Sequence, residues 1–247
     1  MSGATTWVAY SLRANTKNSN GGFIPVAVSS PFSIVQGTSG GGNANGFGSG
    51  TQATIAAARK DIVKLIMGPG GNQKLAAKFL RMGFHDSIGG FDGCIDLTNP
   101  ENGGLQVPIN AMRSIVQAYE GRDGVTRADL WALAATVGAD VLQTDVRVFM
   151  NMDTVGRINC EDANSICLNA EGVQHECSAI RGPNRVIPGM ATNSRDLFDF
   201  FNKEFGFSVK QGVALMGAHT IGELRAVDVG VQGHGWLRNN NIFNNGM

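Results

Sequence analysis

The sequence predicts a mainly α-helical protein, and three observations lead to this prediction. Several stretches repeat apolar residues about every 3.6 positions, capping patterns begin two of them, and strand signals are few. The chain has 247 residues, of which 43% are hydrophobic, so it can bury a core of ordinary domain size. We therefore expect one globular domain with an extension.

The composition changes once, near residue 50. Residues 36–50, QGTSGGGNANGFGSG, are rich in Gly, Ser and Asn and show no periodicity, which is typical of a linker or loop. We therefore expect residues 1–50 to be a poorly specified extension, and residues 51–247 to be the folded domain.

Two helices are expected in the first part of this domain. The first starts at Thr51 and stops at the GPGG of residues 68–71, because Gly and Pro end helices. The second runs from about residue 72 to 86 and ends in the glycines of SIGGFDGC. Its buried side should carry Leu75, Phe79, Leu80 and Met82.

Four more helices are expected further along the chain. A third starts near Pro108, since proline is tolerated in a first turn. A fourth opens with a capping-box pattern at Thr126 and Asp129. After a loop from about 145 to 192, helices are expected at NSRDLFDFFNKEF and SVKQGVALMGAHTIG, the last with Ser208 and Gln211 in a capping arrangement.

The charge balance excludes some classes of partner. Twenty basic and twenty acidic residues give a net charge of zero and a pI near 6.9, which is not the electrostatic footprint of a nucleic-acid binder. No run of about 18 apolar residues is present, and the first residues lack a signal-peptide pattern. We expect neither nucleic acid nor membrane as a partner.

The cysteines allow more than one interpretation. Cys94, Cys160, Cys167 and Cys177 permit three pairings of four thiols, or none. With His175, the last three could form a structural zinc site. Their spacing differs from the usual tight knuckles, so we prefer a disulfide-bearing or irregular loop.

Arg81 and His85 stand four residues apart on the second predicted helix, so both side chains lie on one face. The ordinary interpretation of such a pair is a surface arginine and a core histidine. His219, at the end of the apolar run VALMGA, is of a type that can bind a metal or haem iron.

LRMGFHD (80–86) and VALMGAHTIG (213–222), taken together, resemble the distal and proximal histidine motifs of the plant-type haem peroxidase superfamily. Lesser similarities are PENGGL, ADLWALAATVGA and GWLRNNNIFNN, so the resemblance covers about residues 51–247. It implies the haem-dependent peroxidase fold, with haem b between distal and proximal helices. It also implies reduction of hydrogen peroxide with one-electron oxidation of a small organic donor.

The resemblance assigns roles to five residues. His85 matches the distal acid/base, and Arg81 matches the cation beside the O–O bond. Asn102 matches the asparagine that accepts a hydrogen bond from the distal imidazole. Phe84 matches the aromatic residue on the distal haem face, and His219 matches the axial ligand of the haem iron.

Two further positions are candidates for the haem pocket. Trp236 resembles the tryptophan beside the proximal ligand in the intracellular branch of the family, although a buried packing tryptophan is the alternative. Arg225 is a candidate partner of a haem propionate, with a solvated arginine as the alternative.

The family's cation sites match this chain in part. Asp86 and Asp92 could supply oxygens to a distal calcium ion, but Cys94 stands where a serine hydroxyl is expected. On the proximal side Thr220 matches a ligand position. The other proximal ligand positions are occupied by Leu237 and Asn244.

The end of the chain departs from the family pattern. The resemblance implies a buried aspartate that accepts the second N–H of the proximal imidazole and lies beyond Met247, because Asp228 is too near the motif. The sequence therefore suggests a peroxidase domain truncated at its C-terminus. The alternative function is an inactive peroxidase-like structural or binding module. The electron donor, and intracellular or secreted location, are left open.

Overall fold

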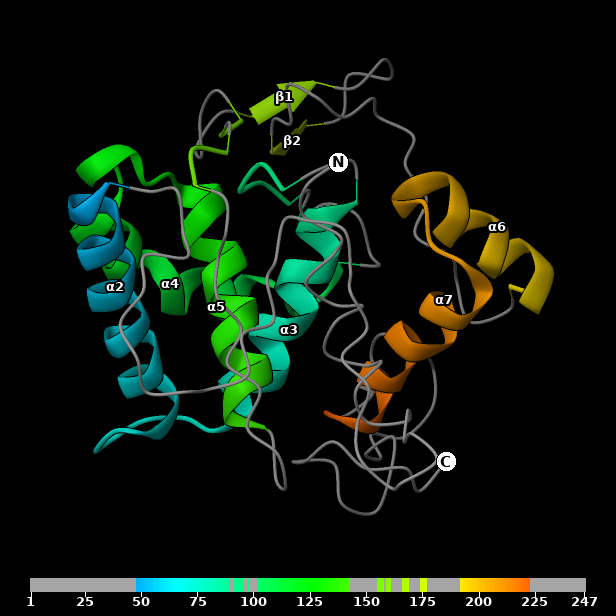
Figure 1. Ribbon diagram of the computed structural model, residues 1–247, viewed down its shortest axis with the longest axis horizontal. Helices are drawn as coiled ribbons and strands as arrows, with labels where there is room; N and C mark the ends of the chain where they lie inside the picture. The colour runs from blue at the N-terminus through cyan, green and yellow to red at the C-terminus, as the bar shows by residue number, and fades with distance from the viewer. Residues whose placement is uncertain are drawn as a thin grey trace.

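The computed structural model describes residues 48–88, 91–95, 97, 102–142, 155–157, 159–160, 166–168, 174–176 and 192–222. These residues are mainly helical, which confirms the predicted fold class (Figure 1). The helices, in chain order, are α2 (Ser49–Met67), α3 (Lys74–Ser87), α4 (Gln106–Tyr119), α5 (Arg127–Val141), α6 (Ser194–Phe205) and α7 (Val209–Met216). Two short 3₁₀ turns are η2 (Arg122–Gly124) and η3 (Gly217–Thr220).

Helix α5 is the centre of the core. Residues 127–139 are all buried, as expected for a helix that is apolar on every side. It begins with the predicted capping box, in which Thr126 and Asp129 each bind the other's backbone. Helix α5 contacts α2, α3 and α4, and Figure 1 shows α2 and α4 on one side of it and α3 on the other.

Helix α3 is fixed by a close crossing with α5. A Cβ atom added to Gly138 of α5 would lie 2.6 Å from the carbonyl oxygen of Ala76 and 3.5 Å from Cβ of Phe79. Only glycine allows the two backbones to approach this closely. As predicted, Leu75, Phe79, Leu80 and Met82 are all buried.

Helices α6 and α7 form a second pair that packs through phenylalanines. A Cβ atom on Gly212 of α7 would lie 2.9 Å from the Phe201 ring and 3.0 Å from the Phe198 ring of α6. The ring centroid of Phe205 lies 6.1 Å from that of Phe84, which connects α6 to α3. The capping box predicted at Ser208 and Gln211 is present and begins α7.

The structure differs from the sequence-based expectations in detail. Helix α2 begins two residues earlier than predicted, and the last predicted helix ends at Met216 and continues as η3. Within the expected loop, β1 (Ile166–Leu168) and β2 (Gln174–Glu176) pair in antiparallel register, with Cys167 opposite His175. Of the helices described, none has the length and apolar character needed to cross a membrane.

Candidate active site

Arg81 and His85 lie on one face of helix α3. Two consecutive residues, Asn102 and Gly103, bind their side chains. His85 Nδ1 lies 2.6 Å from Oδ1 of Asn102, and Arg81 Nη1 donates to the carbonyl oxygen of Gly103 at 2.7 Å. An amide oxygen can only accept, so Nδ1 of His85 carries the proton and Nε2 keeps a lone pair. Asn102 is buried and is itself fixed in the chain by the bond from the Leu105 N–H to its carbonyl oxygen.

The surroundings of His85 keep its imidazole neutral. Burial, followed by the positive charge of Arg81, lowers the pKa of His85 to about 3, and the hydrogen bond to Asn102 opposes this shift. The charge of His219 contributes in the same direction as that of Arg81. The imidazole of His85 is thus in its neutral form at neutral pH.

His219 lies on η3, on the other side of the same region. Desolvation lowers its pKa, and a hydrogen bond to the backbone of Met216 opposes the shift. The side chain is nevertheless exposed. The two facts are compatible because one edge of the ring can meet solvent while protein surrounds the rest.

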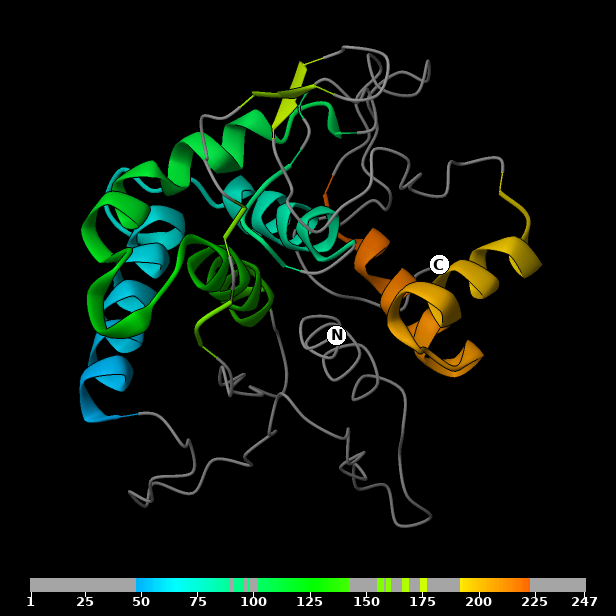
Figure 2. The same cartoon turned by 90° about the horizontal axis from the view of Figure 1, so that it is seen from above.

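The chain directly after His219 packs against α3. A Cβ atom on Gly222, whose φ is +90°, would lie 3.5 Å from Cβ of Ala77. Figures 1 and 2 both show η3 at the end of α7 that lies beside α3. The fold therefore brings His85 and His219, 134 positions apart in the chain, close enough for the charge of one to affect the pKa of the other.

Phe84 is half-buried between the histidine and the phenylalanine cluster of α6. Its ring meets the His85 ring edge-on, with centroids 5.9 Å apart and an interplanar angle of 83°. This contact and the one with Phe205 restrict the orientation of the Phe84 ring.

The residues fit a haem group. A histidine that holds haem iron must be a neutral imidazole, and the lowered pKa of His219 favours its neutral form. A peroxide-binding face needs a base and a fixed cation, and His85 and Arg81 are residues of these two types.

The candidate cation ligands Asp86, Asp92 and Thr220 remain predictions, and the structure shows which contacts they make. No group of three or more His, Cys, Asp or Glu residues suited to a metal occurs in the described part of the chain. The hydroxyl of Thr220 donates to the carbonyl oxygen of Gly217 at 2.9 Å. Asp86 and Asp92 are buried and accept hydrogen bonds from backbone N–H groups.

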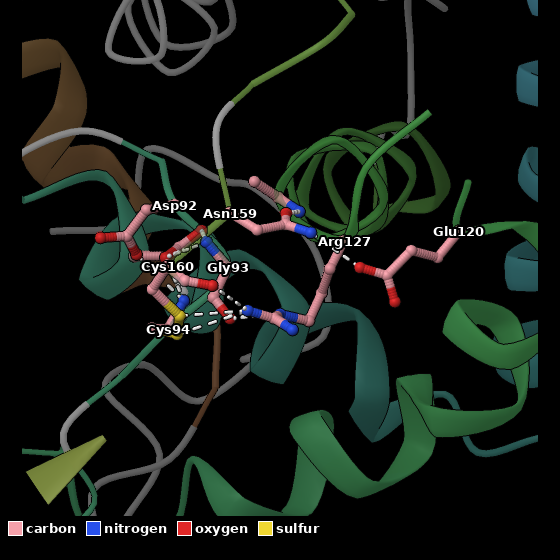
Figure 3. The surroundings of a disulfide bond; sticks show 9 residues. Asp92, Gly93, Cys94, Glu120, Arg127, Asn159 and Cys160 are labelled. Atoms are coloured by element: carbon pink, nitrogen blue, oxygen red, sulfur yellow. Dashed lines mark hydrogen bonds between the residues drawn. A yellow bond between two sulfur atoms is a disulfide. The ribbon is translucent and has the colours of Figure 1, made fainter. Parts of the chain in front are cut away.

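The zinc alternative loses one of its ligands. Cys160 forms a disulfide with Cys94, a pairing that the sequence left open, so its sulfur is not a thiolate ligand (Figure 3). Cys177 lies outside the described residues, as do the haem-pocket candidates Arg225 and Trp236 and the positions Leu237 and Asn244.

Sequence reasoning missed two buried arginines near the site. Arg127, at the start of α5, donates from Nε to the carbonyl oxygen of Gly93 at 2.8 Å. Arg157 Nη1 pairs with Asp129 Oδ1 at 2.8 Å, and both side chains are buried. For Arg127 the available signal was a charged residue at the start of a mainly apolar helix, which does not show what the charge contacts, and for Arg157 the sequence carried no signal.

Comparison with protein-family models matches residues 55–232 to the family described as Peroxidase. The match spans most of the chain and includes both histidine motifs. No curated protein matches the chain. Members of this family generally bind haem and use hydrogen peroxide with a donor substrate. With this match and the helical fold, the chain belongs to the peroxidase family of the plant-type haem peroxidase superfamily.

Proposed function

We propose that this protein is a haem b peroxidase that reduces hydrogen peroxide and oxidises a small organic donor in one-electron steps. The observation that carries the proposal is the pair of contacts made by residues 102 and 103, which orient His85 and Arg81 together. Two electrons from two donor molecules, with two protons, convert one peroxide into two waters.

Haem, when bound, supplies the redox-active iron at which the O–O bond is broken. His219 would hold the haem iron, and its hydrogen bond to the backbone of Met216 would help to orient its ring. Phe84, Arg225 and Trp236 are proposed as further residues that would hold the haem group.

His85 is proposed to move the protons. With its Nδ1–H committed to Asn102, the Nε2 atom accepts a proton from one peroxide oxygen and returns it to the departing oxygen, which leaves as water. Because the pKa of His85 is lowered to about 3, the base form dominates at neutral pH.

Arg81 is proposed to stabilise the negative charge that develops on the departing oxygen. A guanidinium remains charged at any working pH, and the bond from Nη1 to the carbonyl oxygen of Gly103 fixes where that charge lies. A charge that is already in position stabilises the transition state without the free-energy cost of reorganising the site during the reaction.

The proposal is tested by stopped-flow measurement of phenol oxidation by the haem-loaded chain with hydrogen peroxide. We expect turnover that His85→Leu and Arg81→Leu reduce strongly, while Lys74→Ala, an exposed change on the same helix, has no effect. A wild-type rate equal to that of free haemin would contradict the enzyme and favour the inactive binding module.

A further inference from the structure

The loop after α3 contains two buried carboxylates that share one donor. Asp86 and Asp92 are 0% and 1% exposed. The Cys94 N–H lies 3.2 Å from Oδ1 of Asp86 and 3.0 Å from Oδ1 of Asp92, and the Gly93 N–H also donates to Asp86, at 3.1 Å. Two buried negative charges this close need compensation by positive charge or by strong donors.

Arg127 supplies that compensation through a single peptide group. The peptide between Gly93 and Cys94 donates its N–H to the two carboxylates, and its carbonyl oxygen accepts from Arg127 Nε at 2.8 Å. Hydrogen bonds in such a chain polarise one another. The positive charge of the buried guanidinium thereby stabilises the negative charge of both aspartates through the peptide group.

A disulfide fastens the same peptide to the rest of the fold. Cys94 and Cys160 are 66 positions apart in the chain, with Cα atoms 6.2 Å apart. Arg127 Nη2 lies 3.1 Å from Sγ of Cys160 and 3.5 Å from Sγ of Cys94. The Cys160 N–H donates to the carbonyl oxygen of Asp92 at 2.9 Å. Figure 3 shows the guanidinium pointing at the disulfide and at Gly93.

These contacts differ from those of a calcium site. Calcium takes six to eight oxygen ligands, as a rule. Here Asp86 and Asp92 accept N–H groups, and the position where the family pattern expects a hydroxyl is a sulfur engaged in a disulfide. The donor set of the described residues therefore suits an internal cation better than a hard metal ion.

We propose that Arg127 and the Cys94–Cys160 disulfide hold the loop after α3 in place of a bound calcium ion. Since Asp86 directly follows His85, Arg127 is a positioning residue for the distal site. The loop should then be insensitive to chelators and sensitive to reductants. The inference does not depend on the proposed enzymatic function, because its tests need neither haem nor peroxide.

The first test uses the wild-type full chain. Calorimetric titration with calcium chloride should give no binding heat, and the unfolding temperature should be the same in EGTA and in excess calcium. Dithiothreitol should lower the unfolding temperature. It gives two electrons and two protons to the cystine, which becomes two thiols. Dithiothreitol itself is oxidised to a cyclic disulfide. Stoichiometric calcium binding, or a lower unfolding temperature in EGTA, would overturn the proposal.

The second test separates charge from packing at Arg127. We expect Arg127→Met to lower the unfolding temperature by about 10 °C and Arg127→Lys by less, because lysine keeps the charge. Calcium should partly restore the methionine variant and leave the wild type unchanged, a response that a packing role would not produce. Equal losses in the two variants, or no effect of calcium on the methionine variant, would overturn the role assigned to charge.

A third measurement applies if Arg127→Met does not fold. Amide hydrogen exchange of residues 91–95 should accelerate in the Cys94→Ala, Cys160→Ala double variant and in reduced wild type to the same extent. Unchanged exchange in both would show that the disulfide does not hold the loop.

Discussion

The distal and proximal halves of the candidate site are held in different ways. On the distal side, His85 and Arg81 bind partners 17 and 22 positions away in the chain. On the proximal side, His219 binds the backbone of Met216 on its own helical turn, and the neighbouring Thr220 binds Gly217. The contacts of His85 and Arg81 on the distal side thus join distant parts of the chain, whereas the contacts described for His219 and Thr220 are local.

The largest effect should come from the distal base. Replacing His85 by leucine removes the proton acceptor, and general acid–base catalysis is worth about 10²–10⁴-fold. The rate of reaction with peroxide should fall by that factor, measured by stopped-flow spectroscopy, while haem binding is retained. A normal rate in this variant would place the base elsewhere.

The helices around the two halves of the candidate site should also differ in how much one carboxylate contributes to stability. We compare α5 on the distal side with α6 on the proximal side. Asp129 and Asp196 both occupy the third position of a helix, α5 and α6 respectively, but Asp129 is buried and paired with Arg157, whereas Asp196 is exposed. Asp129→Ala removes the carboxylate that pairs with the buried guanidinium of Arg157 and should cost about 3–5 kcal/mol. Asp196→Ala should cost below about 1 kcal/mol.

Urea unfolding of the two variants makes this comparison directly. Equal losses of unfolding free energy would show that the two halves are not held differently.

A smaller effect on the reaction is expected at Asn102. Replacing it by valine removes the bond that orients the His85 ring, which is worth about 1 kcal/mol, and the peroxide rate should fall about tenfold or less. Asn102→Asp keeps an acceptor and should recover most of the rate. A valine variant as fast as the wild type would mean that the ring is oriented by other contacts.

Substitutions at two glycines, one in α5 and one at the end of α7, compare how tightly the distal and proximal sides are packed. Gly138→Ala places a methyl group 2.6 Å from the Ala76 carbonyl oxygen and should cost about 1–3 kcal/mol. Gly217→Ala, at φ −57° with nothing within 4 Å, should be neutral or slightly stabilising. Thermal unfolding measures both, and a destabilised Gly217→Ala would reveal a tightly packed proximal turn.

The smallest effect is expected from pH in the ordinary range. Because the folded-state pKa of His85 is lowered to about 3, its base form is present from neutral pH down to about pH 4 and is lost as the pH falls through 3. The peroxide rate should be nearly constant between pH 5 and 7. An acid limb near pH 6 would show that the ring is less desolvated than the structure indicates.

The positions of the helices, and the placement of Arg81 and His85 on one helix face, could be predicted from the sequence. The period of apolar residues and the two capping boxes depend on neighbours in the chain, so they could be identified without coordinates. The spacing of Arg81 and His85 placed them on one face for the same reason.

Contacts between distant segments could not be derived from the sequence. The Cys94–Cys160 pairing was one of several allowed, and the Gly103 carbonyl and the Arg127 guanidinium gave no pattern. Such contacts depend on how α5 meets the loop after α3, which apolar periodicity does not specify.

The most direct test of the account is a titration of the full chain with haemin, followed by Soret absorbance, for the wild type and for His219→Ala. The account predicts saturable one-to-one binding with a ferric haem spectrum in the wild type, and loss of that spectrum in the variant. Binding that His219→Ala leaves unchanged would contradict the assignment of His219 as the axial ligand, and with it the proposed architecture of the site.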